Sequence, residues 1–441
     1  MLRKSLFAAV LLLCSGWINA QNTTLSPFSR FGLGDLNTPL SSGQFAMGGV
    51  GTGLRMDQII NLSNPAATLF QQKTSFDVGI RYTSLNLANA TAQQRLSSTA
   101  VNHFAYAFPV KNKYTLTAGL IPYSRIGYTL REKKNINDSL SVTNSYKGSG
   151  GLNRAFLGQA FRLYNRKDST VLSAGANINF VFGTIGREAR SVFPSNENYY
   201  NSRNLSFTTV KDLNFDLGLF FSTYPVPTKN IRLNVGATYS LSSTANAILE
   251  NRIESYVTSP TTGNEFVVDT VSYLYDDNGK ITLPQQFSLG TSVEINNKLT
   301  LALDYRTQLW SNYSQTIDNA VIRSNLRNTQ AVHVGFDYTP KRIYVPNLSW
   351  FNYVSYRGGL RYDKQYVVIN NTQLTGIGIS GGLSLPLGKG SSLSRLSLGY
   401  ELYQRGNLNQ TQLKEQTHSL LLGIVIFPTA NDRWFYKRKY D

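Results

Sequence analysis

The chain has 441 residues and a formal net charge of +18 at pH 7, although only 15% of its residues are charged. No window after residue 20 approaches 18 uninterrupted apolar residues, which excludes a transmembrane helix there. A basic chain could bind nucleic acid, but no part of the sequence predicts a domain for that task. Anionic lipid headgroups or lipopolysaccharide are the better partners for this charge.

Residues 1–20 are predicted to be a secretory signal peptide. Arg3 and Lys4 precede an apolar run at 6–13, and the small residue Ala20 ends an acceptable cleavage site. Cys14 raises the alternative of a lipoprotein, but the residues before it lack the small side chain expected at such a site. After cleavage at Ala20 the exported chain would hold no cysteine, and therefore no disulfide bond or thiol ligand.

Residues 21–72 precede the first predicted strand and contain the glycine-rich run "GGVGTG" and the tripeptide "NPA". This segment is too short for a second core and too apolar for a free tail. The run at 48–53 lacks the spacing of a dinucleotide-binding loop, and no strand leads into it. Pro65 removes a backbone donor and biases Asn64 away from helix, so we expect a packed, irregular segment.

From residue 73 onward the sequence alternates between apolar and polar residues, which predicts β-strands with two unlike faces. The stretches "SFDVGIRYT" (75–83) and "AVHVGFDYT" (331–339) are examples. We predict fourteen strands near 74–83, 99–110, 113–130, 153–166, 170–186, 206–224, 230–247, 281–294, 298–310, 328–340, 351–363, 373–386, 391–405 and 416–427.

The connections between these strands alternate in length. Short turns such as "VKNK" and "INNK" alternate with longer segments at 84–98, 131–152, 187–205, 248–280, 311–327, 364–372 and 406–415. This pattern is typical of an up-and-down transmembrane β-barrel, whereas a soluble sandwich would not give it so regularly. We therefore predict an all-β antiparallel barrel at 73–428, in the outer membrane, with both termini on the periplasmic side. The "DDNG" sequence at 276–279 indicates a bend or a hairpin outside the membrane.

Aromatic and charged residues fit this barrel. Trp310 and Tyr313 are expected in one interfacial aromatic belt, and the aromatic residues around Trp350 in the other. Charges on the polar strand faces are expected to point into the lumen: Asp77, Arg81, Asp304, Arg306, Asp337 and Arg395. His333 is expected there too, and Arg55 and Asp57 of the N-terminal segment are expected to pair with such charges. The basic tail at 429–441 is either a periplasmic anchor, a partner surface or a solvated end.

Enzymatic chemistry finds little support. The three histidines, His103, His333 and His418, fall on separate predicted strands, and no metal cluster, cofactor motif or paired-carboxylate motif is present. We expect no catalytic residues, no metal and no cofactor.

The N-terminal stretch resembles the start of the FadL/TodX-type outer-membrane transporters of long-chain fatty acids and other hydrophobic compounds. That family places such a stretch as a hatch inside a fourteen-stranded barrel; the matching residues are Gly48, Gly49, Asp57, Asn64, Pro65 and Ala66. "TAGLIPYSRIGY" (117–128) resembles the family's kinked third strand, which implies a lateral wall opening at Gly119 and Pro122. The stretch at 283–313 also resembles a late strand pair. The stretches at 26–36 and 431–441 depart from the family and suggest a Bacteroidota-like branch.

Two functions remain open. The resemblance implies passive uptake of a hydrophobic, fatty-acid-like molecule by hatch movement and lateral exit. The alternative is a non-transporting barrel subunit of an outer-membrane assembly or secretion complex, which docks other outer-membrane proteins.

Overall fold

The computed structural model describes residues 24–110, 113–136, 140–166, 169–194, 199–226, 230–318, 320–342, 345, 348–387 and 394–427. The predicted signal peptide and C-terminal tail lie outside these residues. The N-terminal elements are the 3-10 helix η1 (Pro27–Arg30), β1 (Asp35–Leu36), α2 (Ser42–Ala46) and the 3-10 helix η2 (Pro65–Phe70). No helix in the described ranges is long and apolar enough to cross a membrane.

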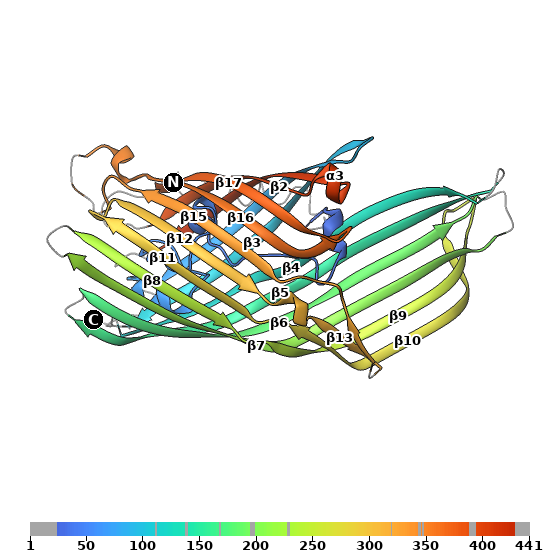
Figure 1. Ribbon diagram of the computed structural model, residues 1–441, viewed down its shortest axis with the longest axis horizontal. Coiled ribbons are helices and arrows are strands. Elements are labelled where there is room, and N and C mark those ends of the chain that lie inside the picture. The colour runs from blue at the N-terminus through green and yellow to red at the C-terminus, as the bar shows by residue number, and fades with distance from the viewer. Residues whose placement is uncertain are drawn as a thin grey trace, which may run out of the picture.

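Fourteen antiparallel strands form a closed ring (Figure 1), because the last strand pairs with the first. The ring strands are β2 (Ser75–Ala88), β3 (Gln93–Val110), β4 (Tyr114–Asn135), β5 (Ser141–Arg166), β6 (Thr170–Val192), β7 (Asn201–Val226), β8 (Ile231–Ser240), β11 (Gln286–Ile295), β12 (Leu299–Gln308), β15 (Thr329–Tyr338), β16 (Ser355–Ile369), β17 (Thr372–Pro386), β18 (Arg395–Arg405) and β19 (Lys414–Ile426). The predicted all-β barrel of about fourteen strands is confirmed.

A curved sheet projects from one end of the ring, at the right of Figure 1. β8, β11, β12 and β15 have ten residues each, which matches the 9–11 residues of a single bilayer crossing. β5 and β7 have 26 residues each and run far beyond the ring. There β9 (Ser243–Thr258) pairs with β7, and β10 (Glu265–Leu283) pairs with β9. We call the parts of β4–β7 beyond the ring, together with β9 and β10, the projecting sheet.

Several predicted loops are therefore wrong. Most of 131–152 and 187–205 continues the strands of β4–β7, and 248–280 forms most of the β9–β10 hairpin. The "DDNG" sequence lies inside β10, at a register shift between Asp276 and Gly279, so it forms a bulge and not a turn. The predicted 364–372 loop is a tight turn at Asn370 and Asn371, both with positive φ. A small hairpin, β13 (Ser314–Ile317) and β14 (Ala320–Arg323), lies between β12 and β15.

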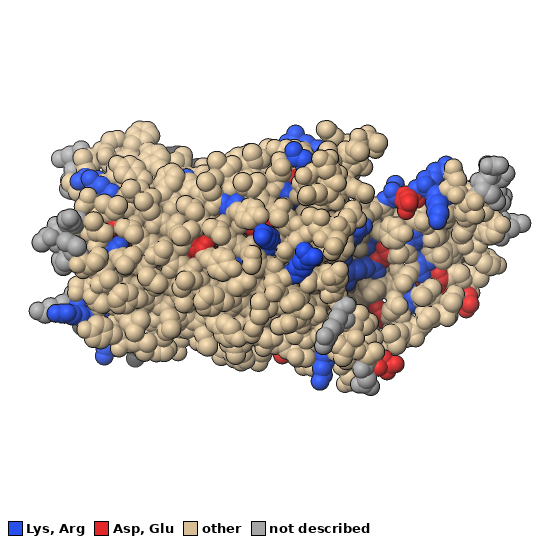
Figure 2. Space-filling view, in the orientation of Figure 1, with Lys and Arg blue, Asp and Glu red and all other residues tan. Residues whose placement is uncertain are grey.

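The ring has an apolar outer face and a polar inner face. Alternate residues are exposed on the outside, including Val78, Ile80, Tyr82, Leu301, Leu303, Val332, Val334 and Phe336. In Figure 2 the surface of the ring carries few charged residues, whereas charges gather over the projecting sheet. The lumen-facing charges Asp77, Asp304, Asp337 and Arg395 are buried, as predicted. His333 is also buried, between outward-facing Val332 and Val334.

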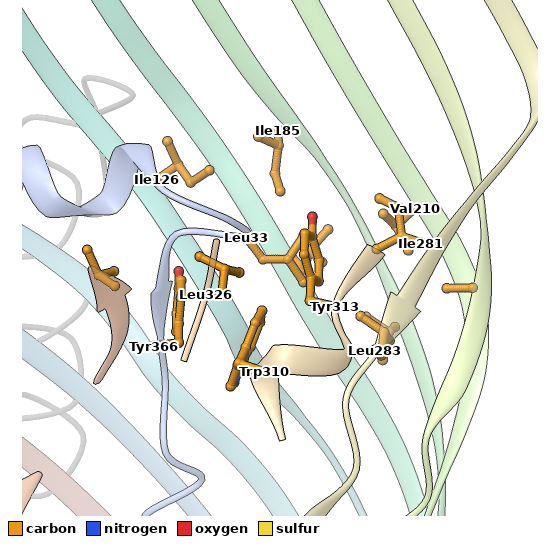
Figure 3. Close-up of a cluster of buried hydrophobic side chains, with 14 of the residues drawn as sticks. Leu33, Ile126, Ile185, Val210, Ile281, Leu283, Trp310, Tyr313, Leu326 and Tyr366 are labelled. Atoms are coloured by element: carbon orange, nitrogen blue, oxygen red, sulfur yellow. The ribbon is translucent and has the colours of Figure 1, made fainter. Parts of the chain in front are cut away.

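An apolar cluster fills the junction between the ring and the projecting sheet. Figure 3 shows Leu33 of the N-terminal segment packed near Tyr313 and Trp310. Trp310 stacks on Tyr366 of β16 with ring centroids 4.3 Å apart. Trp310 and Tyr313 are 0% and 1% exposed, so the prediction that they belong to an interfacial belt is wrong. The 3-10 helix η4 (Trp310–Asn312) turns these rings inward after β12 ends.

Candidate functional site

The N-terminal segment, residues 24–71, lies inside the ring. Its buried groups bond to strands around the whole lumen, and Figure 1 shows it in blue among the ring strands. Four buried apolar clusters contain its residues. A lumen this wide cannot be filled by wall side chains alone, so the segment supplies the missing core.

The glycine-rich run of this segment wraps a carboxylate that the wall supplies. The backbone N–H groups of Gly51 and Thr52 donate to Oδ2 of Asp304 at 2.6 and 2.7 Å, and that of Gly53 donates to Oδ1 at 3.4 Å. Successive backbone N–H groups in a turn make a concave anion site. The run therefore holds an internal anion from β12 and needs no nucleotide or phosphate.

The "NPA" tripeptide forms a second attachment. Asn64 is fully buried, and its side-chain oxygen accepts a hydrogen bond from the Ala66 N–H, which begins η2 at Pro65. The Asn64 amide donates to the carbonyls of Thr52 and, across the lumen wall, Leu219 of β7. The Ser173 hydroxyl of β6 donates to the Ala66 carbonyl at 3.0 Å.

The other predicted hatch residues lie in the same segment. Gly48 and Gly49 have φ values of 72° and 86°, which glycine adopts without strain. The Gly48 N–H donates to the Ser380 hydroxyl, and His333 Nδ1 lies 2.6 Å from the Gly48 carbonyl. Asp57 is half-buried, with no hydrogen bond or ion pair to the described part of the chain.

Arg55 does not form the predicted ion pair with a lumen carboxylate of the described strands. It donates to the Ser222 hydroxyl at 3.3 Å and stacks over the Phe70 ring at 4.2 Å, rather than pairing with a carboxylate. Burial, reinforced by repulsion from Arg232, lowers the pKa of the Arg55 guanidinium to about 10. It therefore still carries its charge at neutral pH.

Sequence reasoning missed a girdle of wall glycines that face the N-terminal segment. At each of them an added Cβ would lie within 3.0 Å of that segment: Gly175, Gly218, Gly236, Gly290, Gly335, Gly359, Gly382, Gly399 and Gly423. For Gly236 the distance to the Thr52 carbonyl oxygen would be 1.9 Å, and for Gly359 the distance to Gly48 N would be 2.3 Å. Glycine at an inward register position on so many strands was the available signal.

A second missed anchor is a buried histidine–carboxylate contact in the wall. His103 Nε2 on β3 lies 2.8 Å from Asp77 Oδ1 on β2, and both side chains are fully buried. The neighbouring Asn102 donates to the Leu40 carbonyl of the N-terminal segment. In the described part of the chain, neither His103 nor Asp77 forms a hydrogen bond with a serine, threonine or cysteine side chain. The described residues also contain no group of three acidic, histidine or cysteine side chains that could hold a metal.

A cavity of about 330 Å³ lies between residues 24–40 of the N-terminal segment and the inner wall. Its described lining includes seven arginine or lysine side chains and five carboxylates. Arg405 joins the two sides, because it pairs with Glu415 at 2.7 Å and with Asp35 of the N-terminal segment at 2.8 Å. The cavity therefore combines charged side chains with apolar ones such as Leu36, Leu96 and Val367, whereas pockets that hold hydrophobic ligands are predominantly apolar.

The predicted wall opening falls where two ring strands diverge. β3 and β4 pair only from Phe104 opposite Leu120 to the turn that joins them. Gly119 lies just inside this paired part, and the register of β4 against β5 shifts between Pro122 and Ser124. A bulge at Pro122 is thus present. β1 pairs with β4 beyond the bulge, at Arg125 and Ser124.

The projecting sheet ends in an unusual strand. Residues 265–279 of β10 pair with β9 on one side and, among the described strands, with none on the other. Both faces of this part are uncovered, because consecutive residues are exposed. Its exposed apolar side chains are Phe266, Val267, Val268, Val271, Tyr273, Leu274 and Tyr275.

Comparison with solved structures identifies the same architecture elsewhere. The toluene transporter TodX of P. putida has a TM-score of 0.60 and 14% identity, covering 89% of this chain and 99% of that one. The toluene transporter TbuX of Ralstonia pickettii gives 0.58 and 13%, with 89% and 99% covered. A FadL homologue of Pseudomonas aeruginosa gives 0.55 and 13%, with the same coverage. At these identities the likeness extends to the fold alone.

No curated protein matches the chain. The fold therefore agrees with the resemblance to FadL/TodX-type transporters, whereas the family model that matches the sequence is a different one. The family model described as BamG matches residues 1–441, the whole chain. The protein belongs to the BamG family.

Proposed function

We propose that this protein is an outer-membrane β-barrel, closed by its own N-terminal segment, that docks another protein on its projecting sheet. The observation that carries the proposal is the open, apolar edge of β10 outside the ring. The apolar outer face of the ring supports membrane placement, because a closed barrel with such a face is suited to lipid. The projecting sheet then lies in water, beyond the membrane.

The fixed N-terminal segment supports a role other than passage through the lumen. Moving it would leave the Asp304 carboxylate without the two short N–H bonds from Gly51 and Thr52. It would also uncover the glycine girdle, where backbone meets backbone at positions such as Gly236 and Gly359. Each buried polar group left without a partner costs about 1–3 kcal/mol, so displacing the N-terminal segment would be strongly unfavourable.

The edge of β10 supports protein docking. Proteins normally protect a free edge strand with charges, proline or a covering element, because the unpaired N–H and C=O groups accept a further strand. Contiguous exposed apolar side chains mark interaction sites. Here both features coincide on residues 265–279, so a partner strand would gain main-chain hydrogen bonds and apolar contacts together.

A second candidate is passage of a hydrophobic molecule, favoured by the divergence of β3 and β4 beside the cavity. Leu96 of β3 and Arg125 of β4 both line that cavity. The charged lining opposes this function, because an apolar ligand would have to cover arginine and carboxylate groups that need polar partners. We therefore rank docking first.

The test is purification of the tagged protein from its own outer membrane, followed by native mass spectrometry. The edge variant Phe266→Asp with Val271→Asp places charge on the proposed interface. The matched control is Val321→Asp, which alters a residue that is 60% exposed on the neighbouring β14. We expect a stoichiometric protein partner with wild type and the control, and its loss from the edge variant.

Two results would contradict docking. If the partner remains bound to the edge variant at full stoichiometry, β10 is not the docking site. A barrel that carries only a hydrophobic small molecule, lost in a Pro122→Val variant, favours the second candidate.

A further inference from the structure

The cavity inside the ring has an excess of positive charge that its own carboxylates do not neutralise. Three arginines are paired across it: Arg154 with Asp216 at 3.3 Å, Arg361 with Glu401 at 3.0 Å, and Arg405 with both Asp35 and Glu415. These three arginines pair with four of the five carboxylates in the lining, because Arg405 pairs with two of them. The fifth, Asp363, accepts a hydrogen bond from the Tyr403 hydroxyl at 2.8 Å.

Four other cations of the lining, Arg81, Arg125, Arg306 and Lys364, have no ion pair with the described residues. Arg125 donates to the Val101 carbonyl at 2.7 Å, which leaves Arg81 and Arg306 as the two lining arginines without a hydrogen-bond acceptor among the described residues. Neither has a carboxylate within ion-pair distance in the part of the chain that the structure describes. Arg81 instead lies over the Phe45 ring at 4.9 Å, and the Nε atoms of both arginines are buried without an acceptor. Asp304 attracts Arg306 electrostatically, but it already accepts hydrogen bonds from the glycine-rich run.

Neighbouring cations repel the guanidinium groups of Arg81 and Arg306, which raises the free energy of these charges when no anion is bound. Arg306 is repelled by Arg154 and Arg361, and Arg81 is repelled by Arg125 and Arg361, although Glu401, the ion-pair partner of Arg361, also attracts Arg81. Arg361 therefore lies within electrostatic range of both, and all five arginine side chains line the same cavity. Like charges in a partly dry site are costly unless an anion joins them.

We propose that this cavity binds a small polyanion that carries phosphate or carboxylate groups, held by Arg81 and Arg306 with Arg361 between them. Guanidinium groups bind such anions through paired N–H donors, and the two unpaired arginines offer these donors. A cavity of about 330 Å³ has room for a compact anion or a headgroup. This site is independent of docking on β10, because it uses none of the same residues.

Isothermal titration calorimetry tests the proposal with sodium pyrophosphate as the probe and the full chain in detergent micelles. Sodium chloride at the same ionic strength corrects for screening. We expect saturable binding to wild type, weakened at least tenfold in the double variant Arg81→Gln with Arg306→Gln. The matched control is Arg166→Gln, an exposed arginine outside the cavity, and it should bind as wild type does.

No saturable binding to wild type, or equal affinity in the double variant, overturns the proposal. If the double variant does not yield a folded, heat-modifiable barrel, each single variant is titrated instead. Each is expected to lose affinity several-fold, and unchanged affinity in both again overturns it.

A second arm identifies the source of the anion. The protein is extracted gently from its own membrane, treated with pyrophosphate, and the released molecules are partitioned between chloroform and water. Released phosphorus in the organic phase identifies a lipid headgroup, and a released anion in the aqueous phase identifies a free metabolite. Release of only uncharged lipid or hydrocarbon contradicts the assignment.

Discussion

The ring and the projecting sheet share strands β4–β7, but they differ in how their outermost strands are paired. In the ring, β19 closes on β2 and the N-terminal segment fills the inside, so every strand has two neighbours along at least part of its length. In the projecting sheet, β10 has one neighbour along most of its length and exposed apolar residues on both faces. The first region is complete by itself, whereas the second offers a surface that another molecule can complete.

The two regions also differ in what holds them in order. The ring is stabilised by dry packing of backbone against the glycine girdle and by buried polar anchors such as Asp304. The end of the projecting sheet depends on ion pairs, in which Arg203 contacts Glu254 and Glu265, and Arg190 contacts Glu265. We therefore expect stability to reside in the ring and the proposed docking surface to lie on the sheet, and substitutions should separate the two.

The largest effect is expected for Asp304→Ala. The variant leaves the N–H groups of Gly51 and Thr52 buried without an acceptor, and each such loss costs about 1–3 kcal/mol. We expect the free energy of unfolding of the ring to fall by roughly 3 kcal/mol or more. Urea titration of the barrel in lipid vesicles, followed by tryptophan fluorescence, measures this change.

Asp304→Asn is the graded control, because its amide oxygen can still accept one of these bonds. Its loss should lie between those of wild type and Asp304→Ala. Equal stability of all three proteins would show that the glycine-rich run does not depend on the carboxylate. It would also place the N-terminal segment among the movable parts of the molecule.

Much of the ring could be predicted from the sequence because a wall between lipid and a polar lumen imposes a strict period of two. Val332, His333 and Val334 illustrate this: the outer residues are apolar and the one between them is polar and buried. The lumen-facing position of Asp304 followed from the same alternation. Its partner did not, because the contact with Gly51 joins positions more than 250 residues apart.

The projecting sheet could not be predicted in this way. Its buried positions hold polar side chains such as Glu254 and Thr208 as well as Tyr256, so no face must be apolar throughout and the alternation fades, as in the polar stretch at 131–152. The residues at 276–279 are typical of a tight turn, but they form a bulge within β10, which uses the same residue types. Trp310 was misplaced because an aromatic residue at a strand end serves a belt or a buried cluster equally well.

A smaller effect is expected within the girdle. In Gly236→Ala the new methyl group meets the Thr52 carbonyl oxygen, a backbone atom that cannot rotate away. Overpacking of this kind costs about 1–3 kcal/mol, so we expect a loss of roughly 2 kcal/mol. The measurement is the urea midpoint of the barrel in vesicles.

Gly381→Ala is the matched control, because its Cβ would meet one atom only, the Arg357 carbonyl oxygen at 3.7 Å. This variant should unfold at the wild-type midpoint or slightly above it. If both glycine variants unfold alike, the girdle does not hold the N-terminal segment, and the contrast between the ring and the sheet loses its main support.

The smallest effect is expected in the projecting sheet, for Arg203→Ala. The variant removes bonds of 2.6 Å to Glu254 and 2.8 Å to Glu265, and a cation–π contact with Tyr256. Glu254 and Tyr256 are buried, but Glu254 keeps its ion pair with Arg252 and Glu265 keeps that with Arg190, so the loss should be about 1 kcal/mol and confined to the hairpin. Hydrogen exchange should quicken in β9 and β10 and stay unchanged in β12, while the urea midpoint of the ring remains at the wild-type value. A fall in that midpoint would mean that the two regions unfold together, and that the sheet contributes to the stability of the barrel.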